Sequence, residues 1–246
     1  MELKHEERTP ECVLVIVAHH DDIEFGMAGS VARWREHGAQ VVYCVITDGS
    51  AGSNDPQVNP EELARRRAKE QLAAAATVGV TDVRFLSYRD GVLQPTLEVR
   101  RDLTRLIREI RPDRVVAMDP TAIFINGTYI NHPDHRAAGE AAIYATFPSA
   151  GTRPIIAELL AEGLEPHDVR ELYLGLTLEP NLAVDITPYI DRKIEALLCH
   201  RSQVGLEASD LIRGWDAESG RRAGVEYAEL YRVIRLVEDE TQPARD

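Results

Sequence analysis

The sequence of 246 residues contains only three cysteines, Cys12, Cys44 and Cys199, and none of them forms a C-x-x-C pair. Their odd number and wide spacing favour neither a disulfide framework nor a cysteine zinc site. Cys12 and Cys44 lie at or within apolar, strand-like segments, where we expect buried thiols. A reducing cytoplasm is therefore the expected location.

The sequence also lacks long hydrophobic runs. Its apolar segments are far shorter than the ~20 residues of a membrane-spanning helix. The first eight residues, MELKHEER, do not contain the apolar centre of a signal peptide. We therefore expect neither a membrane span nor a signal peptide.

Basic residues are outnumbered, with 28 Lys and Arg against 41 Asp and Glu, for a net charge of −13. Because a phosphate backbone is bound by a basic field, this charge argues against nucleic acid as the main partner. The length suffices for a sizeable core without a stabilising disulfide or metal. The sequence shows no linker, repeat or low-complexity tract, so we expect one domain over residues 1–246.

Buried strands are indicated by short apolar runs rich in β-branched residues. We predict them at 12–18, 40–46, 82–86 and 114–118. Predicted helices follow these strands at 28–37, 61–78, 96–110 and 134–146. Four alternations of strand and helix predict an α/β fold, a Rossmann-like, mostly parallel sheet with right-handed crossovers and helices on both faces.

The sequence beyond residue 150 is less regular. Segments 170–176 and 181–186 resemble strands, and segments 187–201 and 219–236 resemble helices. We expect these elements to complete the same domain.

Two clusters of histidine and aspartate follow predicted strands, at residues 19–22 (HHDD) and 132–135 (HPDH). Ligands of open parallel sheets bind beyond the carboxyl ends of the strands. Each cluster alone has an ordinary explanation, because Asp21 or Asp22 can cap a helix and histidines are common near helix starts. Together, and without cysteine, the clusters match a catalytic zinc, which has three nitrogen or oxygen ligands and an open fourth position.

At these residues the sequence resembles the PIG-L/LmbE-like deacetylase family, whose pattern is A-H-P-D-D followed later by H-P-D-H. Here the two motifs read AHHDD at 18–22 and HPDH at 132–135. The resemblance covers most of residues 12–145, and its further matches are Thr47-Asp48-Gly49, Arg67-x-x-Glu70 and Asp90-Gly91. It implies an LmbE-like fold and metal-dependent removal of acetyl groups from N-acetylglucosamine-containing molecules.

The resemblance implies a role for each residue of the two motifs. The implied metal ligands are His19, Asp22 and His135. Asp21 is implied as the general base toward metal-bound water. His132 is implied to stabilise the oxyanion or to protonate the leaving amine, and Asp134 to orient a histidine, for which His132 is the first candidate.

Further implications concern the substrate, the metal and the assembly. Arg67 and Asp90 match family positions that contact hydroxyl or phosphate groups of a small acylated amino-sugar substrate. The metal is expected to be Zn²⁺, with Fe²⁺ also compatible, because imidazole and carboxylate ligands suit both. The resemblance also implies a homo-oligomer, a trimer or a hexamer.

One residue departs from the family pattern, because His20 stands where proline is usual. Adjacent side chains of an extended chain point in opposite directions, so His19 and His20 cannot easily both reach one metal. The match favours His19, and a shifted register with His20 as the ligand stays open.

The same residues also allow functions other than that of a deacetylase. A two-metal phosphoesterase usually needs more ligands than these histidines and aspartates supply. A nucleotide-binding Rossmann module would need G-x-G-x-x-G after the first strand, where Asp21 and Asp22 would instead repel a pyrophosphate. A non-catalytic metal-binding protein would not need Asp21 or His132. Two alternatives stay open: a metal-dependent hydrolase of a different amide or ester, and a non-catalytic metal-binding member of the family.

Several other polar residues have two readings. Glu24 is either a partner of a metal-bound histidine or a first-turn helix acid. Asp48 either shapes a turn or bonds a ligand histidine. His200 is predicted near a helix end, where a cationic histidine is favoured. The candidates for lining the pocket ahead of the second motif are Asn126, Tyr129 and Asn131.

Overall fold

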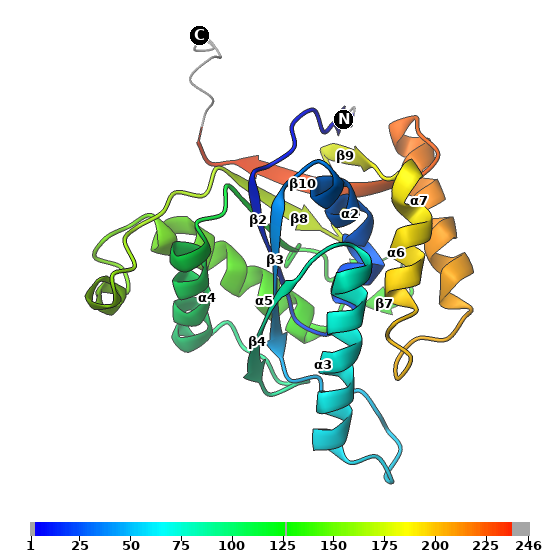
Figure 1. Cartoon of the computed structure of the whole chain (residues 1–246), viewed down its shortest axis with the longest axis horizontal. Helices are drawn as coiled ribbons and strands as arrows, with labels where there is room; N and C mark the ends of the chain where they lie inside the picture. The colour runs from blue at the N-terminus through cyan, green and yellow to red at the C-terminus, as the bar shows by residue number, and fades with distance from the viewer. Residues whose placement is uncertain (1–2, 126, 238–246) are drawn as a thin grey trace.

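The structure, a computed structural model, describes residues 3–125 and 127–237. The four predicted apolar segments lie side by side in one half of an eight-stranded sheet that has helices on both faces (Figure 1). In spatial order the strands are β1 (Lys4–His5), β9 (Leu182–Asp185), β10 (Ala228–Arg235), β8 (Glu171–Gly175), β5 (Arg114–Met118), β2 (Cys12–Val17), β3 (Gln40–Thr47) and β4 (Asp82–Tyr88).

Strands β4, β3, β2, β5 and β8 run parallel, whereas β10 is antiparallel to both of its neighbours, β8 and β9. The predicted α/β class and mostly parallel sheet are therefore confirmed. A separate two-stranded antiparallel hairpin pairs β6 (Phe124–Ile125) with β7 (Tyr129–Ile130).

Alternate side chains of β2 pack into two different cores, one on each face of the sheet. Val13 and Val15 belong to one core and Leu14 and Ile16 to the other, and all four are fully buried. A strand covered by helices on both faces must be apolar on both, which explains the continuous hydrophobic run in the sequence.

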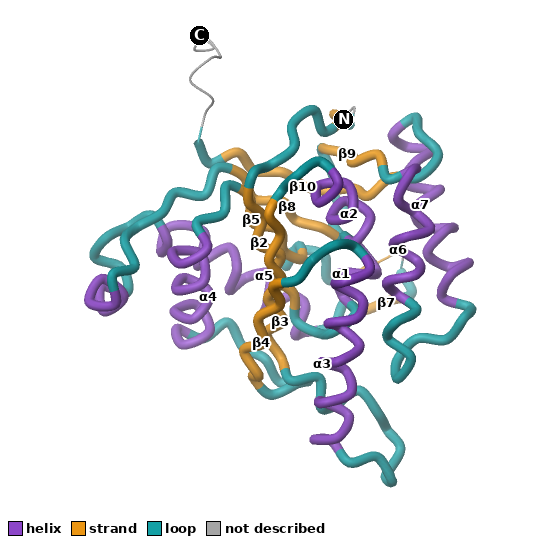
Figure 2. Tube along the Cα trace, viewed as in Figure 1, coloured by secondary structure: helices purple, strands orange, loops and turns teal. Residues whose placement is uncertain are grey.

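The helices divide into two layers (Figure 2). The layer over the first core contains α1 (Asp22–Gly26), α2 (Ala28–Glu36), α3 (Pro60–Thr77), α6 (Ile190–Leu197) and α7 (Ala208–Ala223). The opposite layer contains α4 (Leu97–Ile110) and α5 (Pro133–Tyr144). Short helical turns lie at Ala145–Ala150, Ala157–Glu162 and Thr187–Tyr189.

Local sequence explains where helices α3 and α4 begin. Asn59 accepts hydrogen bonds from the first turn of α3, and Pro60 occupies its first position. Thr96 caps α4 in the same way. Among the described residues no helix is both long enough and apolar enough to cross a membrane.

The predicted helix at 219–236 is wrong. Helix α7 ends at Ala223, where Gly224 takes a left-handed backbone with φ of 75°, and residues 228–235 form strand β10. Glycine in this conformation ends helices efficiently. The pairing of β10 between β8 and β9 then outweighs the helical preference of its residues, because buried strands gain from cross-strand packing.

Strand β10 also stabilises the first helical layer through Glu229. Its carboxylate accepts hydrogen bonds from the backbone N–H groups of Gly29 (3.0 Å) and Ser30 (2.7 Å) in the first turn of α2. The Nζ of Lys193 on α6 lies 2.8 Å from Glu229 and 2.8 Å from Asp216. An anion at a helix N-terminus is favourable, and here it also neutralises a fully buried ammonium group.

We expect Glu229→Ala to destabilise the protein by about 3 kcal/mol, because it leaves a buried ammonium without one of its two partners. Urea denaturation measures this change. The matched control is Glu226→Ala, an exposed glutamate three residues earlier, for which a change below about 0.5 kcal/mol is expected. Equal midpoints for the two variants would contradict this role of Glu229.

Candidate functional site

The two histidine–aspartate clusters meet at the carboxyl edge of the sheet. His135 Nε2 lies 3.1 Å from His19 Nδ1 and 3.1 Å from Asp22 Oδ1. Asp22 and His19 are also close to each other, with Asp22 Oδ2 lying 3.6 Å from His19 Nδ1. Two side chains of the first motif and one that lies more than 100 residues later thus place nitrogen and oxygen donors around one point.

The first cluster is shaped by the tight passage from β2 to α1. Asp22 Oδ2 accepts a hydrogen bond from the backbone N–H of His19 at 2.7 Å, which leaves Oδ1 turned toward His135. Asp21 occupies the N-cap position of α1 with φ of 91°, and among the described residues its side chain caps no backbone N–H of that helix. The Asp21 carboxylate is therefore not committed to helix capping.

The second cluster begins helix α5. Pro133 takes the first helical position, for which its fixed φ is suited. His132 Nδ1 accepts a hydrogen bond from the backbone N–H of Asp134 at 3.2 Å. A neutral His132 ring therefore carries its proton on Nε2, the nitrogen that is free to face a ligand.

Asn131 fixes the orientation of His135. Its Nδ2 donates to the carbonyl of Ala122 at 2.8 Å, which turns Oδ1 toward His135 Nδ1 at 3.0 Å. His135 Nδ1 therefore donates, and the lone pair of Nε2 faces His19 and Asp22. This role of Asn131 was not predicted from the sequence, where the signal for it was the spacing of four residues between Asn131 and His135 across the start of a helix.

Two further aspartates orient His19 from its other nitrogen. Asp90 Oδ1 lies 3.1 Å and Asp134 Oδ2 lies 3.4 Å from His19 Nε2. Burial lowers the pKa of His19, but the carboxylates of Asp22, Asp134 and Asp90 outweigh it and raise this pKa to about 12. Both aspartates thus belong to the histidine cluster itself.

These positions differ from the sequence-based assignments. Asp134 lies closer to His19 than to His132, whose Nδ1 is 4.0 Å from Asp134 Oδ1. Its carboxylate also accepts backbone hydrogen bonds from Gly91 (2.8 Å) and Leu93 (3.1 Å). Sequence distance hid this arrangement, because His132 is only two residues from Asp134 and His19 is far away.

Arg67 braces the loops around the site. Its guanidinium donates to the carbonyl of Gly49 at 3.1 Å and to that of His20 at 2.9 Å. It also lies 3.7 Å from Asp21 Oδ1 and 3.6 Å from Asp90 Oδ2. Arg67 and Asp90 were both expected to contact substrate, but both are buried and contact residues of the site.

His20 points away from the cluster. Its ring stacks on Phe85, with centroids 5.4 Å apart, and burial followed by the charges of Arg67 and His200 lowers its pKa to about 3. Gly49 packs against it so closely that a Cβ there would lie 2.7 Å from His20 Nδ1. Of the two adjacent histidines, the structure brings His19 to His135 and Asp22.

Burial and the neighbouring Asp22 carboxylate raise the pKa of Asp21 to about 7, against the opposing effect of Arg67. A divalent ion in the neighbouring site would lower this pKa again, because a nearby cation favours the ionised form of a carboxylate.

The donor set fits a divalent metal ion. The gathered atoms are imidazole nitrogens and carboxylate oxygens, which suit zinc and iron. In two groups of three side chains, the donor atoms within the group all lie within 4.8 Å of one another. The first group is His19, His132 and His135, and the second is His19, Asp90 and Asp134. The excess of buried carboxylates around His19 is a charge distribution that a cation would neutralise.

The other candidate residues take structural positions. Asp48 Oδ1 accepts from the backbone N–H groups of Ser50 (3.0 Å) and Asp90 (3.3 Å), which is the turn role. Glu24 and His200 are both fully buried and contact each other. His200 follows the end of α6 at Leu197, near a helix end as predicted, and although burial lowers its pKa, the Glu24 carboxylate outweighs burial and raises it. Tyr129 is exposed, and Asn126 lies outside the described residues.

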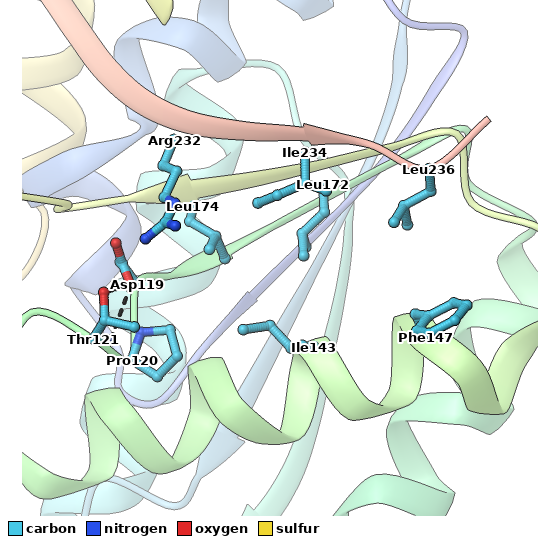
Figure 3. A pocket seen from close by; sticks show the side chains of 10 residues that line it. All are labelled: Asp119, Pro120, Thr121, Ile143, Phe147, Leu172, Leu174, Arg232, Ile234 and Leu236. Atoms are coloured by element: carbon cyan, nitrogen blue, oxygen red, sulfur yellow. Dashed lines mark hydrogen bonds between the residues drawn. The ribbon is translucent and has the colours of Figure 1, made fainter. Parts of the chain in front are cut away.

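A cavity of about 290 Å³ lies apart from the cluster, between the β8–β10 face of the sheet and α5 (Figure 3). Its lining is mostly apolar and includes Leu172, Leu174, Ile234 and Phe147. Its polar end holds Asp119, whose carboxylate accepts hydrogen bonds from Thr121.

The fold and the cluster together define an α/β protein with a histidine–aspartate centre at the carboxyl edge of its sheet. The family model described as PIG-L, GlcNAc-PI de-N-acetylase, matches residues 14–146. This match contains every residue of the two clusters. The chain belongs to this family of deacetylases, and the resemblance seen in the two motifs is confirmed.

Relatives that are named as deacetylases resemble the chain over most of its length. The diacetylchitobiose deacetylase of Thermococcus kodakarensis is 34% identical over 90% of this chain and 82% of its own. A probable N-acetyl-alpha-D-glucosaminyl L-malate deacetylase 2 of Bacillus anthracis is 29% identical over 88% of this chain and 91% of its own.

A solved relative supports the fold. The structure of the N,N'-diacetylchitobiose deacetylase of Pyrococcus horikoshii superposes with a TM-score of 0.85. The two proteins are 34% identical, and the match covers 92% of this chain and 84% of the other.

The geometry separates the two adjacent histidines. We expect purified His19→Ala to lose the bound metal ion, because His19 faces His135 and Asp22, and His20→Ala to keep about one ion per chain. Elemental analysis of dialysed protein measures the content. If His20→Ala loses the metal and His19→Ala keeps it, the ligand is His20, as in the shifted register of the first motif.

Proposed function

We propose that the protein is a metal-dependent hydrolase that removes the N-acetyl group from an N-acetylglucosamine-type sugar or conjugate. The observation that carries the proposal is the convergence of His19, Asp22 and His135. The residue next to Asp22 in sequence, Asp21, has a carboxylate that, within the described residues, caps no backbone N–H of α1. Membership of the deacetylase family and the names of the relatives, which refer to acetylated amino sugars, support the substrate class.

We propose His19, Asp22 and His135 as the ligands of a zinc ion, with Fe²⁺ as the alternative metal. Such an ion polarises the scissile carbonyl and lowers the pKa of a water molecule to about 7. Asp90 and Asp134 fix the His19 ring through Nε2 and so leave Nδ1 for the ion. This placement favours an orienting role for Asp90 over the substrate contact that the sequence suggested.

Asp21 is proposed as the general base. Its carboxylate borders the ligand Asp22 in sequence, and its side chain keeps 15% of its surface exposed. In this position it can accept the proton of the attacking water. Arg67, 3.7 Å away, favours the ionised carboxylate that this step requires.

His132 is proposed to donate a proton. Its side chain is 40% exposed, against 16% for His135 and 10% for His19. Burial and the neighbouring His19 lower the pKa of His132. The Nε2–H of the neutral ring can donate to the developing oxyanion, and a protonated ring can deliver a proton to the leaving amine.

The remaining expectations are proposals that rest on the family resemblance. We propose one domain over residues 1–246, a homo-oligomer of three or six copies, and a location in the cytoplasm. All three cysteines are free thiols, which fits a reducing compartment. Arg67, being buried, is proposed to shape the substrate site through the Gly49 and His20 carbonyls.

The test is release of free amine from a panel of N-acetylglucosamine conjugates by metal-loaded and chelator-stripped protein. We expect release that depends on the metal and returns when zinc is restored. If the protein binds one metal ion per chain yet releases amine from none of the conjugates, the deacetylase proposal fails. The remaining functions would then be hydrolysis of a different amide or ester, or a non-catalytic metal-binding role.

Substitutions separate the proposed base and acid from the ligands. We expect Asp21→Asn and His132→Ala to keep the metal while kcat falls by roughly 10²–10⁴. His135→Ala should lose the metal. Metal analysis and amine release on the same preparations decide the matter, and metal loss from His132→Ala would instead make His132 a ligand.

A further inference from the structure

A chain of buried hydrogen bonds leads from Asp21 into the protein interior. The backbone N–H of Asp21 donates to Gln71 Oε1 at 3.2 Å. Gln71 Nε2 donates to both carboxylate oxygens of Glu24, at 3.1 and 3.3 Å. Glu24 Oε2 lies 3.0 Å from His200 Nε2, and the side chains of Gln71, Glu24 and His200 are fully buried.

Three separate elements supply this chain. Gln71 lies on α3, one turn after Arg67, so both side chains face the site. Glu24 lies on α1, and His200 follows α6. Buried polar groups are costly unless they are paired, and here both ends of the Gln71 amide are engaged. The amide orientation is thereby fixed, with its oxygen toward Asp21.

The backbone at Asp21 needs such support. Its φ of 91° is sparsely populated by residues other than glycine, and it persists only where the surroundings hold it. Gln71 holds the Asp21 N–H, and the Asp21 carbonyl accepts from the backbone N–H of Glu24 at 2.9 Å. This conformation directs the Asp21 side chain away from helix capping.

We propose that Gln71, Glu24 and His200 are positioning residues that hold Asp21 in the conformation required of a general base. The proposal rests on the function proposed above for Asp21. Within the described part of the chain, the hydrogen bonds of these three side chains connect them to one another and to Asp21 rather than to the proposed metal ligands. Their loss therefore affects proton transfer and leaves the metal in place.

The first variant is Gln71→Met, which keeps the shape of the side chain but removes both hydrogen bonds. We expect kcat to fall about 10–100-fold through misplacement of Asp21, with KM and metal content unchanged. Gln40→Met is the matched control, because Gln40 is exposed at the amino end of β3, opposite the site. It should retain the wild-type kcat.

The second variant tests the hydrogen-bond pattern itself. In the double variant Gln71→Glu with Glu24→Gln, the new carboxylate accepts from Asp21 and from the new amide, whose oxygen accepts from His200. The chain of hydrogen bonds and the net charge are both preserved. We expect this exchange to recover most of the kcat that Gln71→Met loses, which a merely space-filling role would not produce.

A measurement independent of turnover is hydrogen exchange of the Asp21 amide, followed by NMR. It should be at least about 10-fold faster in Gln71→Met than in wild type, and unchanged in Gln40→Met. Unchanged exchange, or a kcat equal to wild type in Gln71→Met, would overturn the proposal. If the wild type releases no amine, the proposed function fails, while the exchange rates still decide whether Gln71 holds Asp21.

Discussion

The concentration of carboxylates around His19 is the constraint on which the site depends. Asp22, Asp90 and Asp134 each approach a ring nitrogen of His19 within 3.6 Å, and all three are buried. Like charges in a water-poor interior repel strongly, so they can be held together only by donors around them and by positive charge among them. Backbone N–H groups from two loops and the Arg67 guanidinium supply the donors. A proton on His19, or a divalent ion beside it, supplies the charge.

The parallel sheet and the meeting of the two motifs could be predicted from sequence, because apolar runs mark strands buried on both faces and parallel strands end at one edge. The strand at 228–235 could not, since its partners are chosen by packing rather than by local preference. The pairing of Asp90 and Asp134 with His19 was also hidden, because nothing local connects residues so far apart. Asn131 was recognisable only as a residue near the second motif.

The departure at residue 20 has a physical explanation in the fold. The carbonyl of His20 is held by Arg67, so the chain keeps its course past the site without a proline. The imidazole fills the space between Phe85 and Gly49, where the absence of a side chain on residue 49 makes room for it. His20, which the sequence alone presents as an alternative metal ligand, is thus a buried side chain that packs against Phe85 and Gly49. The same helix, α3, carries Arg67 and Gln71, and so supports this loop at two successive turns.

The strand order has a consequence for how the chain folds as it is made. Among the described residues, β1 pairs with β9, β9 joins the rest of the sheet through β10, and β10 follows both of them along the chain. During vectorial synthesis residues 4–5 leave the ribosome long before residues 182–185 and 228–235. Strand β1 therefore cannot take its place in the sheet until β10 has emerged. Contacts of such long sequence separation are formed late and slow the final assembly of the sheet.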